Sequence, residues 1–456
     1  MGDAVSEVVI LSDHSERVYH SRVDRMQSVW TKTAQLPRFE SLKQDMKTDV
    51  LVIGGGIAGL LCAYLLKQAG VAYTLVEAER ICGGITKDTT AKITMQHGLI
   101  YDKLVRKFGV EKARMYLHVN QQALEKYRSL SESIDCDFQE RRSVVYSLDS
   151  RQRIEKELEA LQKVGYSARF STELPLPFPV AGAVCFEGQA QFHPLKFLSA
   201  IAENLCIFEN TRVLELMPGA AVTEHGTIKA EKIIVATHFP LLNKHGSYFL
   251  KLYQHRSYVL ALRNAPEVRD MYVDESDAGL SFRSFGEILL LGGSGHRTGK
   301  KGGGWQELEA FSRQHYPDAR ITERWATQDC ITLDGMPYVG RYSRRTPNLY
   351  VTTGFNKWGM TSAMAAAILL VDLALGMENP CAELFSPSRM MLRPQLAVNA
   401  VESTLHLLTP TVPRCPHMGC ALKYNRQEHS WDCPCHGSRF TEDGQLIDTP
   451  ATGDMK

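Results

Sequence analysis

Two short runs near the C-terminus of this 456-residue chain combine thiols with imidazoles. Cys415 and His417 form the first pair, and Cys433 and His436 form the second. Two thiolates and two imidazoles can hold a mixed-ligand [2Fe–2S] cluster, in which one iron takes the sulfurs and the other takes the nitrogens. The same ligands can close a tetrahedral zinc site. The single residue between Cys415 and His417, and the Gly and Pro residues around both pairs, favour the cluster over zinc.

A glycine-rich turn lies towards the other end of the chain. An apolar run over 48–53 predicts a strand, and Gly54, Gly56 and Gly59 follow it where a helical pattern begins. Backbone N–H groups at such a helix start can face a pyrophosphate. Glu77 ends the next predicted strand, where a carboxylate that binds a ribose hydroxyl is expected. The pattern therefore indicates a dinucleotide without a 2′-phosphate, which is either FAD or NAD.

Four ordered motifs further along the chain resemble the D-amino-acid oxidase-like flavoproteins. They are the runs 83–92 and 233–238, the segment 334–340 and the helix start 354–361. In that family the last motif faces the flavin pyrimidine ring, so the resemblance implies FAD rather than NAD. The FAD-binding residues that we expect from the turn and from this resemblance are Gly54, Gly56, Gly59, Glu77, Thr86, Thr90, Ala91, Val213, Ala236, Gly354, Gly359, Met360 and Thr361.

The two C-terminal pairs resemble the Rieske iron–sulfur family. The cluster ligands that the resemblance implies are Cys415, His417, Cys433 and His436. It also implies partly solvent-exposed imidazoles and a disulfide between Cys420 and Cys435, which respiratory-type members carry and oxygenase-type members lack. Two free buried thiols are the alternative. Ser438 matches a hydroxyl that donates to a bridging sulfide, but Phe440 replaces a tyrosine donor, so we expect a potential below that of respiratory members.

The order of these motifs predicts the domain organisation. We expect an α/β fold with a Rossmann-like FAD-binding domain of the glutathione-reductase type, an antiparallel-sheet substrate domain and a small all-β Rieske domain. The predicted divisions are an N-terminal extension over 1–45, a discontinuous FAD-binding domain over 46–130, 190–250 and 325–378, a substrate domain over 131–189 and 251–324, a linker over 379–404 and the Rieske domain over 405–456.

Together the two resemblances imply an FAD-dependent oxidoreductase that acts on CH–NH bonds. An amine or amino-acid-like small molecule would give a hydride to FAD, and single electrons would pass to the cluster and an external acceptor. The alternatives are a cluster that serves as a redox sensor or structural element, and electron flow in reverse from a partner to the flavin. A Rieske oxygenase is disfavoured because no convincing two-His-one-carboxylate group is found. The glycine-rich run 292–295 lacks the rest of a nucleotide motif, so we interpret it as a turn that ends a strand.

Residues on the substrate side carry weaker signals. Arg256 could hold a carboxylate and Lys357 could lie near the flavin ring, and Tyr258 and His296 complete the set of catalytic candidates. Each of them could equally make a structural ion pair or hydrogen bond. His97 follows the flavin-contacting run and could attach FAD covalently, although a hydrogen-bonding role is favoured.

The composition is that of an ordinary soluble protein. Hydrophobic residues make up 44% of the chain, and 52 basic residues balance 51 acidic ones, so nothing points to nucleic-acid binding. The longest apolar run, 363–375, is too short for a membrane span and contains Asp372. The N-terminus lacks the shape of a secretory signal. We therefore expect a cytoplasmic protein whose partners are a small-molecule substrate and an external electron acceptor or donor protein, with no membrane span.

Overall fold

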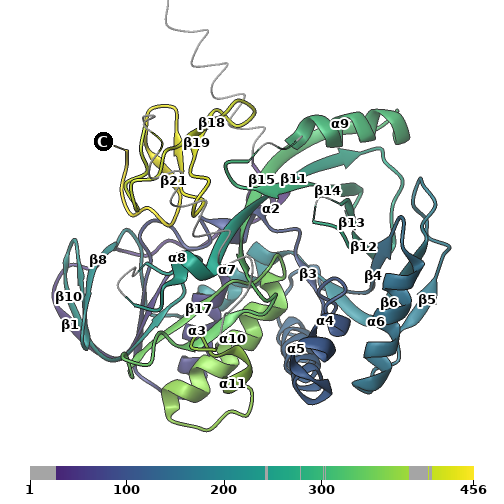
Figure 1. Ribbon diagram of the computed structural model, residues 1–456. Helices are drawn as coiled ribbons and strands as arrows, with labels where there is room; N and C mark the ends of the chain where they lie inside the picture. Colours follow the sequence, from purple (N-terminus) through teal and green to yellow (C-terminus); the bar gives the residue numbers. More distant parts are fainter. Residues whose placement is uncertain are drawn as a thin grey trace, which may run out of the picture.

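The computed structural model describes residues 27–241, 245–277, 279–300, 302, 304–389, 409 and 413–455. In this part of the chain the strands form three sheets, which Figure 1 shows as adjoining bodies. The expected α/β class, with its mixed sheets and a small all-β C-terminal domain, is confirmed. Most of the expected N-terminal extension and linker, and the first residues of the expected Rieske domain, lie outside the described residues.

The first sheet is built on parallel strands. Its strands are β1 (Met46–Ile53), β2 (Tyr73–Val76), β7 (Ile207–Phe208), β8 (Val213–Met217), β9 (Ala220–Thr223), β10 (Gly226–Val235), β16 (Tyr338–Arg341) and β17 (Leu349–Thr353). The main order is β16–β17–β10–β1–β2–β7, with only β16 antiparallel to its neighbour, while β9 pairs with β10 and β8 pairs with β9. The end of β1 is buried from Val50 to Ile53, as expected of a strand covered on both faces.

Helices pack around this core. They are α2 (Val29–Thr33), α3 (Ile57–Gln68), the 3₁₀ helix η1 (Ile85–Asp88), α4 (Tyr101–Phe108), α5 (Val110–Ser131), α6 (Arg151–Lys163), α7 (Pro194–Ala202), α8 (Tyr248–Lys251), α9 (Gly304–His315), α10 (Gly359–Leu375) and α11 (Ala382–Phe385). The alanine-rich α10 packs against both α3 and α5 and is buried over most of its surface, so it is apolar nearly all round. None of the described helices is long and apolar enough to cross a bilayer.

The second sheet is mostly antiparallel. Its strands are β3 (Lys92–Ile93), β4 (Gln139–Ser147), β5 (Arg169–Ser171), β6 (Gly182–Gln191), β11 (Leu252–Arg263), β12 (Met271–Asp274), β13 (Ser281–Phe285), β14 (Ile288–Arg297) and β15 (Arg320–Thr332). The order is β15–β11–β14–β13–β12–β4–β6–β3, with β5 beside β6 and only β12 and β4 parallel. The expected turn at 292–295 is wrong, because β14 continues through these residues and a register shift opposite Arg256 and Tyr258 absorbs the irregularity.

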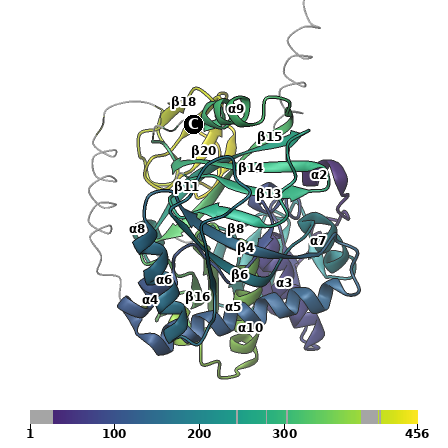
Figure 2. The ribbon, with the colours of Figure 1, turned by 90° about the vertical axis from the view of Figure 1, so that its right-hand side faces the viewer.

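The third sheet is small and lies near the C-terminus, in the part of the chain that we call the cluster domain (residues 413–455). Its strands β18 (Lys423–Asn425), β19 (Ser430–Asp432), β20 (Arg439–Thr441) and β21 (Leu446–Asp448) pair antiparallel in sequence order. Figures 1 and 2 show this domain against β11 and β15 of the second sheet. Its small core is centred on the cysteines of the two ligand loops.

Candidate functional site

A cavity of about 680 Å³ lies where the parallel strands of the first sheet meet the second sheet. Ile53, Val76, Ala236 and Thr353 line it from the carboxyl ends of β1, β2, β10 and β17. Open parallel sheets bind ligands at this edge, because the loops that follow the strands and the helix starts converge there. The cavity is therefore the candidate cofactor site.

The turn after β1 fits a dinucleotide closely. Gly54 has a φ of +110°, and a Cβ on it would lie 2.7 Å from Ala236 O. A Cβ on Gly59 would lie 1.9 Å from Gly54 O, so only glycine lets α3 approach the strand. Glu77 accepts a hydrogen bond from Gly55 N at 2.7 Å, which fixes its carboxylate beside the turn. A cradle with bare backbone and an adjacent carboxylate fits the pyrophosphate and ribose of FAD.

The cavity collects most of the residues that we expect to contact FAD. Those that line it are Gly54, Gly56, Glu77, Thr86, Thr90, Val213, Ala236, Gly354, Gly359 and Met360. Gly59, Ala91 and Thr361 do not line it. Gly59 serves helix packing, and Thr361 Oγ1 donates to Thr94 O at 2.8 Å. Ala91 is buried, and its carbonyl accepts a hydrogen bond from Arg283 at 2.8 Å.

His97 also lines the cavity, and both of its ring nitrogens are hydrogen-bonded. Nδ1 lies 2.6 Å from Tyr116 Oη, and Nε2 lies 2.8 Å from Thr94 O. Burial lowers the pKa of His97 to about 3, so the ring is neutral. This arrangement favours the hydrogen-bonding role over the covalent one.

The four expected cluster ligands lie together in the cluster domain. The thiols of Cys415 and Cys433 contact each other, and the rings of His417 and His436 meet edge to face with their centroids 4.9 Å apart. His436 is 1% exposed, and neither of its ring nitrogens has a hydrogen-bond partner among the described residues. Burying unsatisfied ring nitrogens is costly, so this residue fits a ligand whose partner is a metal. The site therefore fits the [2Fe–2S] group that the spacing indicates.

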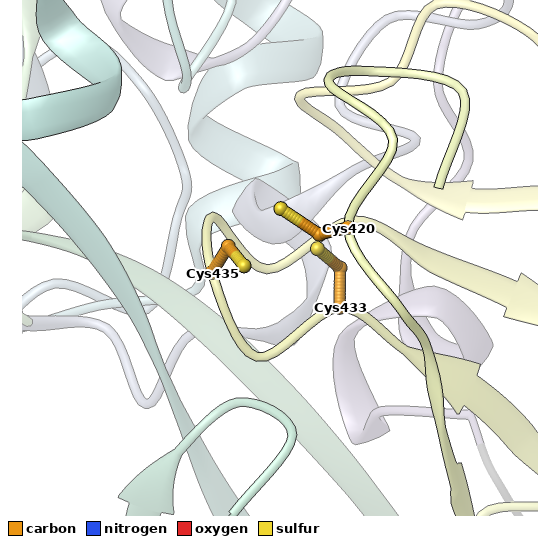
Figure 3. Close-up of side chains that lie close together, drawn as sticks. All are labelled: Cys420, Cys433 and Cys435. Atoms are coloured by element: carbon orange, nitrogen blue, oxygen red, sulfur yellow. The ribbon is translucent and has the colours of Figure 1, made fainter. Parts of the chain in front are cut away.

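Three cysteine sulfurs lie within 4.8 Å of one another at this site. They belong to Cys420, Cys433 and Cys435, whose side chains converge from the two ligand loops in Figure 3. A single tetrahedral zinc ion would need the two thiolates and the two imidazoles equally close to one another. Among the described residues, no imidazole nitrogen belongs to a group that close. A two-iron cluster instead separates the sulfur pair from the nitrogen pair. Cys420 and Cys435 are free thiols in the structure, so their expected disulfide stays a prediction.

The imidazole edge of the cluster site faces the rest of the molecule. The ring of Phe239, which lines the cavity, lies 6.1 Å from the ring of His417 between centroids. Phe249 covers His436 at the same centroid distance. The expectation of two partly solvent-exposed imidazoles is therefore wrong for His436, because the docked flavin-binding body covers it. One phenyl ring separates the cavity from His417.

Three of the four catalytic candidates lie in a polar network between the cluster domain and β11 and β14. Arg256 forms a buried ion pair with Glu428, and Tyr258 Oη donates to the same carboxylate at 3.0 Å. His296 Nε2 lies 2.9 Å from Tyr258 Oη. Burial opposes the ionisation of Glu428, but Arg256 and Arg439 outweigh it and lower the pKa of Glu428 to about 2. The guanidinium of Arg256 is thus committed to the cluster domain, which agrees with the structural ion pair that was the alternative to a carboxylate-binding role.

Lys357, the fourth catalytic candidate, lines the cavity, as Tyr258 also does. Its Nζ donates to Asp277 O at 3.0 Å, and burial lowers its pKa. Asp329 on β15 faces the same space, and burial raises the pKa of its carboxyl group. Lys92 also lines the cavity beside Thr90 Oγ1 at 3.0 Å, and burial lowers its pKa to about 7. No sequence signal points to Asp329, since it belongs to no motif and only the strand pairing directs it inwards.

The cluster domain itself forms part of the cavity wall. The segment 446–452, which comprises β21 and the residues that follow it, lines the same space as the glycine turn of the first sheet. No local pattern predicts this arrangement, because it depends on how the domains dock.

Comparisons with known proteins agree with this geometry. Residues 49–373 match the family model of FAD dependent oxidoreductases, and residues 395–456 match that of the Rieske [2Fe-2S] domain. The putative Rieske 2Fe-2S iron-sulfur protein YhfW of Bacillus subtilis (strain 168) is 32% identical over 96% of this chain and 98% of its own. The gamma-glutamylputrescine oxidoreductase of Escherichia coli (strain K12) is 23% identical over 74% of this chain and 86% of its own. The structure of L-proline dehydrogenase from P. horikoshii aligns with a TM-score of 0.65 at 18% identity, covering 76% of this chain and 98% of that one, which shows a shared fold.

Proposed function

We propose that this chain is a dehydrogenase of amines or amino-acid-like small molecules. It belongs to the FAD-dependent oxidoreductase family and carries a C-terminal Rieske [2Fe-2S] domain. Electrons taken from the substrate would leave one at a time through the cluster towards an external acceptor. The names of two similar proteins, a gamma-glutamylputrescine oxidoreductase and an L-proline dehydrogenase, support this substrate class.

The contact between Phe239, the cavity and His417 carries this proposal. One side chain touches both redox sites, so a centre held by His417 lies close to the cofactor cavity. The cluster domain is also held in place by the buried pair of Arg256 and Glu428. A fixed, short separation suits direct electron transfer between the two centres.

The residues around the cavity would transfer the proton and orient the substrate. When bound, FAD accepts a hydride equivalent and the [2Fe–2S] group carries one electron. Asp329 faces the cavity, and burial raises its pKa, so its ionised carboxylate would accept the proton that an ammonium substrate must lose before its carbon can give up a hydride. Lys357 lines the same space and lies close enough to Asp329 for their charges to interact, so it would orient the substrate beside that carboxylate, while the segment 446–452 forms one wall.

Anaerobic reduction of the purified holoprotein tests the proposal. The protein is first titrated with dithionite to record the spectra of both reduced centres, and is then mixed with a panel of amines and amino acids. We expect one of these compounds to bleach the flavin and to produce the reduced-cluster signal in low-temperature EPR within one turnover. A flavin that cycles with substrate while the cluster stays oxidised would instead identify the cluster as a sensor or structural element.

A further inference from the structure

The strand β21 presents an apolar side chain to the cavity from the cluster domain. Successive side chains of a strand point to opposite faces. Leu446 packs against the cluster-domain core, and Asp448 turns to Arg439, whose guanidinium lies 2.9 Å from its carboxylate. Ile447 lies between them and therefore points the other way. It lines the cavity and is 47% exposed. A large apolar side chain left open in a cavity wall is a surface that a ligand can cover.

Hydrogen bonds fix the segment in this position. Gln254 on β11 donates to Thr449 O at 2.7 Å, and Ala451 N donates to Ser438 Oγ at 2.9 Å. Gln328 donates to Gly437 O at 2.8 Å, and a Cβ on Gly437 would lie 2.5 Å from the Gln254 side chain. The contact between the domains is therefore close and specific. The wall is held at the cavity by polar groups from both sides of the interface.

We propose that Ile447 is a specificity-determining residue of the substrate pocket, and that it selects amines that carry an apolar group. The inference rests on the proposed function, because it assigns the non-reacting part of the same substrate to this wall. Asp277, Asp329 and Lys357 line the same cavity and would meet the charged amine end of a substrate. Ile447 is a large, exposed apolar side chain that a hydrocarbon substituent could cover, and its removal should weaken binding more than it slows the chemical step.

The test compares Ile447→Ala and Ile447→Trp with a matched control, Ile321→Ala. Ile321 lies on β15, is 43% exposed and does not line the cavity. The first measurement is iodide quenching of the fluorescence of bound FAD in the holoprotein. Ile447→Ala should raise the quenching constant above that of the wild type and Ile447→Trp should lower it, while the control matches the wild type. This measurement reports how well the wall shields the bound FAD from solvent, and it requires no turnover.

The second measurement is KM and kcat with propylamine, pentylamine and heptylamine. KM of the wild type should fall as the alkyl chain lengthens, and Ile447→Ala should raise KM by about fourfold for each substrate methylene group that the wall no longer covers, with a smaller change in kcat. Equal quenching constants in all four proteins would overturn the inference. So would an unchanged KM series in Ile447→Ala. If no amine reduces the flavin while the quenching constants differ as stated, the proposed function fails and Ile447 still stands as a cavity wall.

Discussion

The cluster site and the cofactor cavity are assembled in different ways. The four expected ligands of the cluster come from two loops of one small domain, between Cys415 and His436. The cavity is instead lined from all three sheets, by residues as distant in sequence as Gly54 and Thr452. A site made by two loops depends on its own domain, whereas a site made by three bodies depends on their docking. Perturbations of the interface should therefore reach the cavity before they reach the cluster.

Removing a cluster ligand gives the largest effect and tests whether the cluster site is local. Cys433 is 0% exposed and lies in the core of the cluster domain. Cys433→Ser should abolish the reduced-cluster EPR signal and lower iron and acid-labile sulfide to background, because a hydroxyl is a poor substitute for a thiolate ligand. FAD content should stay at the wild-type level. Loss of FAD together with the cluster would show that the cavity depends on a filled cluster domain.

Replacing the cavity carboxylate has the next largest effect. Asp329→Asn keeps the shape of the side chain but removes the group that accepts a proton, so amine-driven reduction of the flavin should slow by about 10²-fold or more. The dithionite-reduced cluster spectrum should be unchanged, because the cluster ligands lie elsewhere. Stopped-flow absorbance under anaerobic conditions measures the rate. A rate equal to that of the wild type would remove Asp329 from the proton transfer.

Breaking the buried ion pair tests the docking itself. Arg256→Gln removes one of the two buried guanidinium groups that pair with Glu428 and leaves Arg439 as the other, so it should cost about 1–3 kcal/mol of unfolding free energy. The double variant Arg256→Gln/Glu428→Gln should recover much of that stability, because no uncompensated charge remains. Thermal and denaturant unfolding, followed separately by flavin and cluster absorbance, measure both centres. Because the cavity depends on docking and the cluster site does not, we expect the flavin absorbance to change before the cluster absorbance. Simultaneous loss of the two signals would contradict this expectation.

The same pair carries a pH dependence with a definite sign. The folded-state pKa of Glu428 is about 2, below the ordinary value of 4.5, so the folded protein holds fewer protons on this group than the unfolded chain. The stabilisation is complete above the unfolded pKa and is lost as the pH falls from about 4.5 towards 2. The difference in unfolding free energy between the wild type and Glu428→Gln should therefore shrink over this range. A difference that stays constant would show that the carboxylate is not the group responsible.

The ligand pairs and the glycine turn could be predicted from sequence because each is a short-range pattern. The spacing from Cys415 to His417 and the glycines after β1 carry their geometry in a few consecutive residues, and both family expectations are confirmed. Sequence reasoning leaves open whether Arg256 holds a substrate carboxylate or makes a structural ion pair, because nothing in β11 tells which domain covers it. Its partner, Glu428, becomes visible only when the domains dock. Ile447 escapes sequence reasoning for the same reason.

The smallest effect concerns the potential of the cluster and belongs to its domain alone. Phe440 on β20 is 0% exposed and packs in the same small core as Cys415 and Cys433. Phe440→Tyr adds a hydroxyl at the position where the Rieske resemblance implies a donor to a ligand sulfur, so we expect it to raise the cluster potential. Ser438→Ala should lower it, because Ser438 contacts the thiol of Cys415. An EPR-monitored redox titration measures both shifts, and the flavin potential serves as the internal control because it should stay constant. An unchanged cluster potential in both variants would rule out hydrogen bonding to sulfur as the source of the lower potential that we expect relative to respiratory-type Rieske members.

A flavin potential that moves together with the cluster potential would show that the two sites are coupled through the wall at 446–452, whose Ala451 N–H is hydrogen-bonded to Ser438.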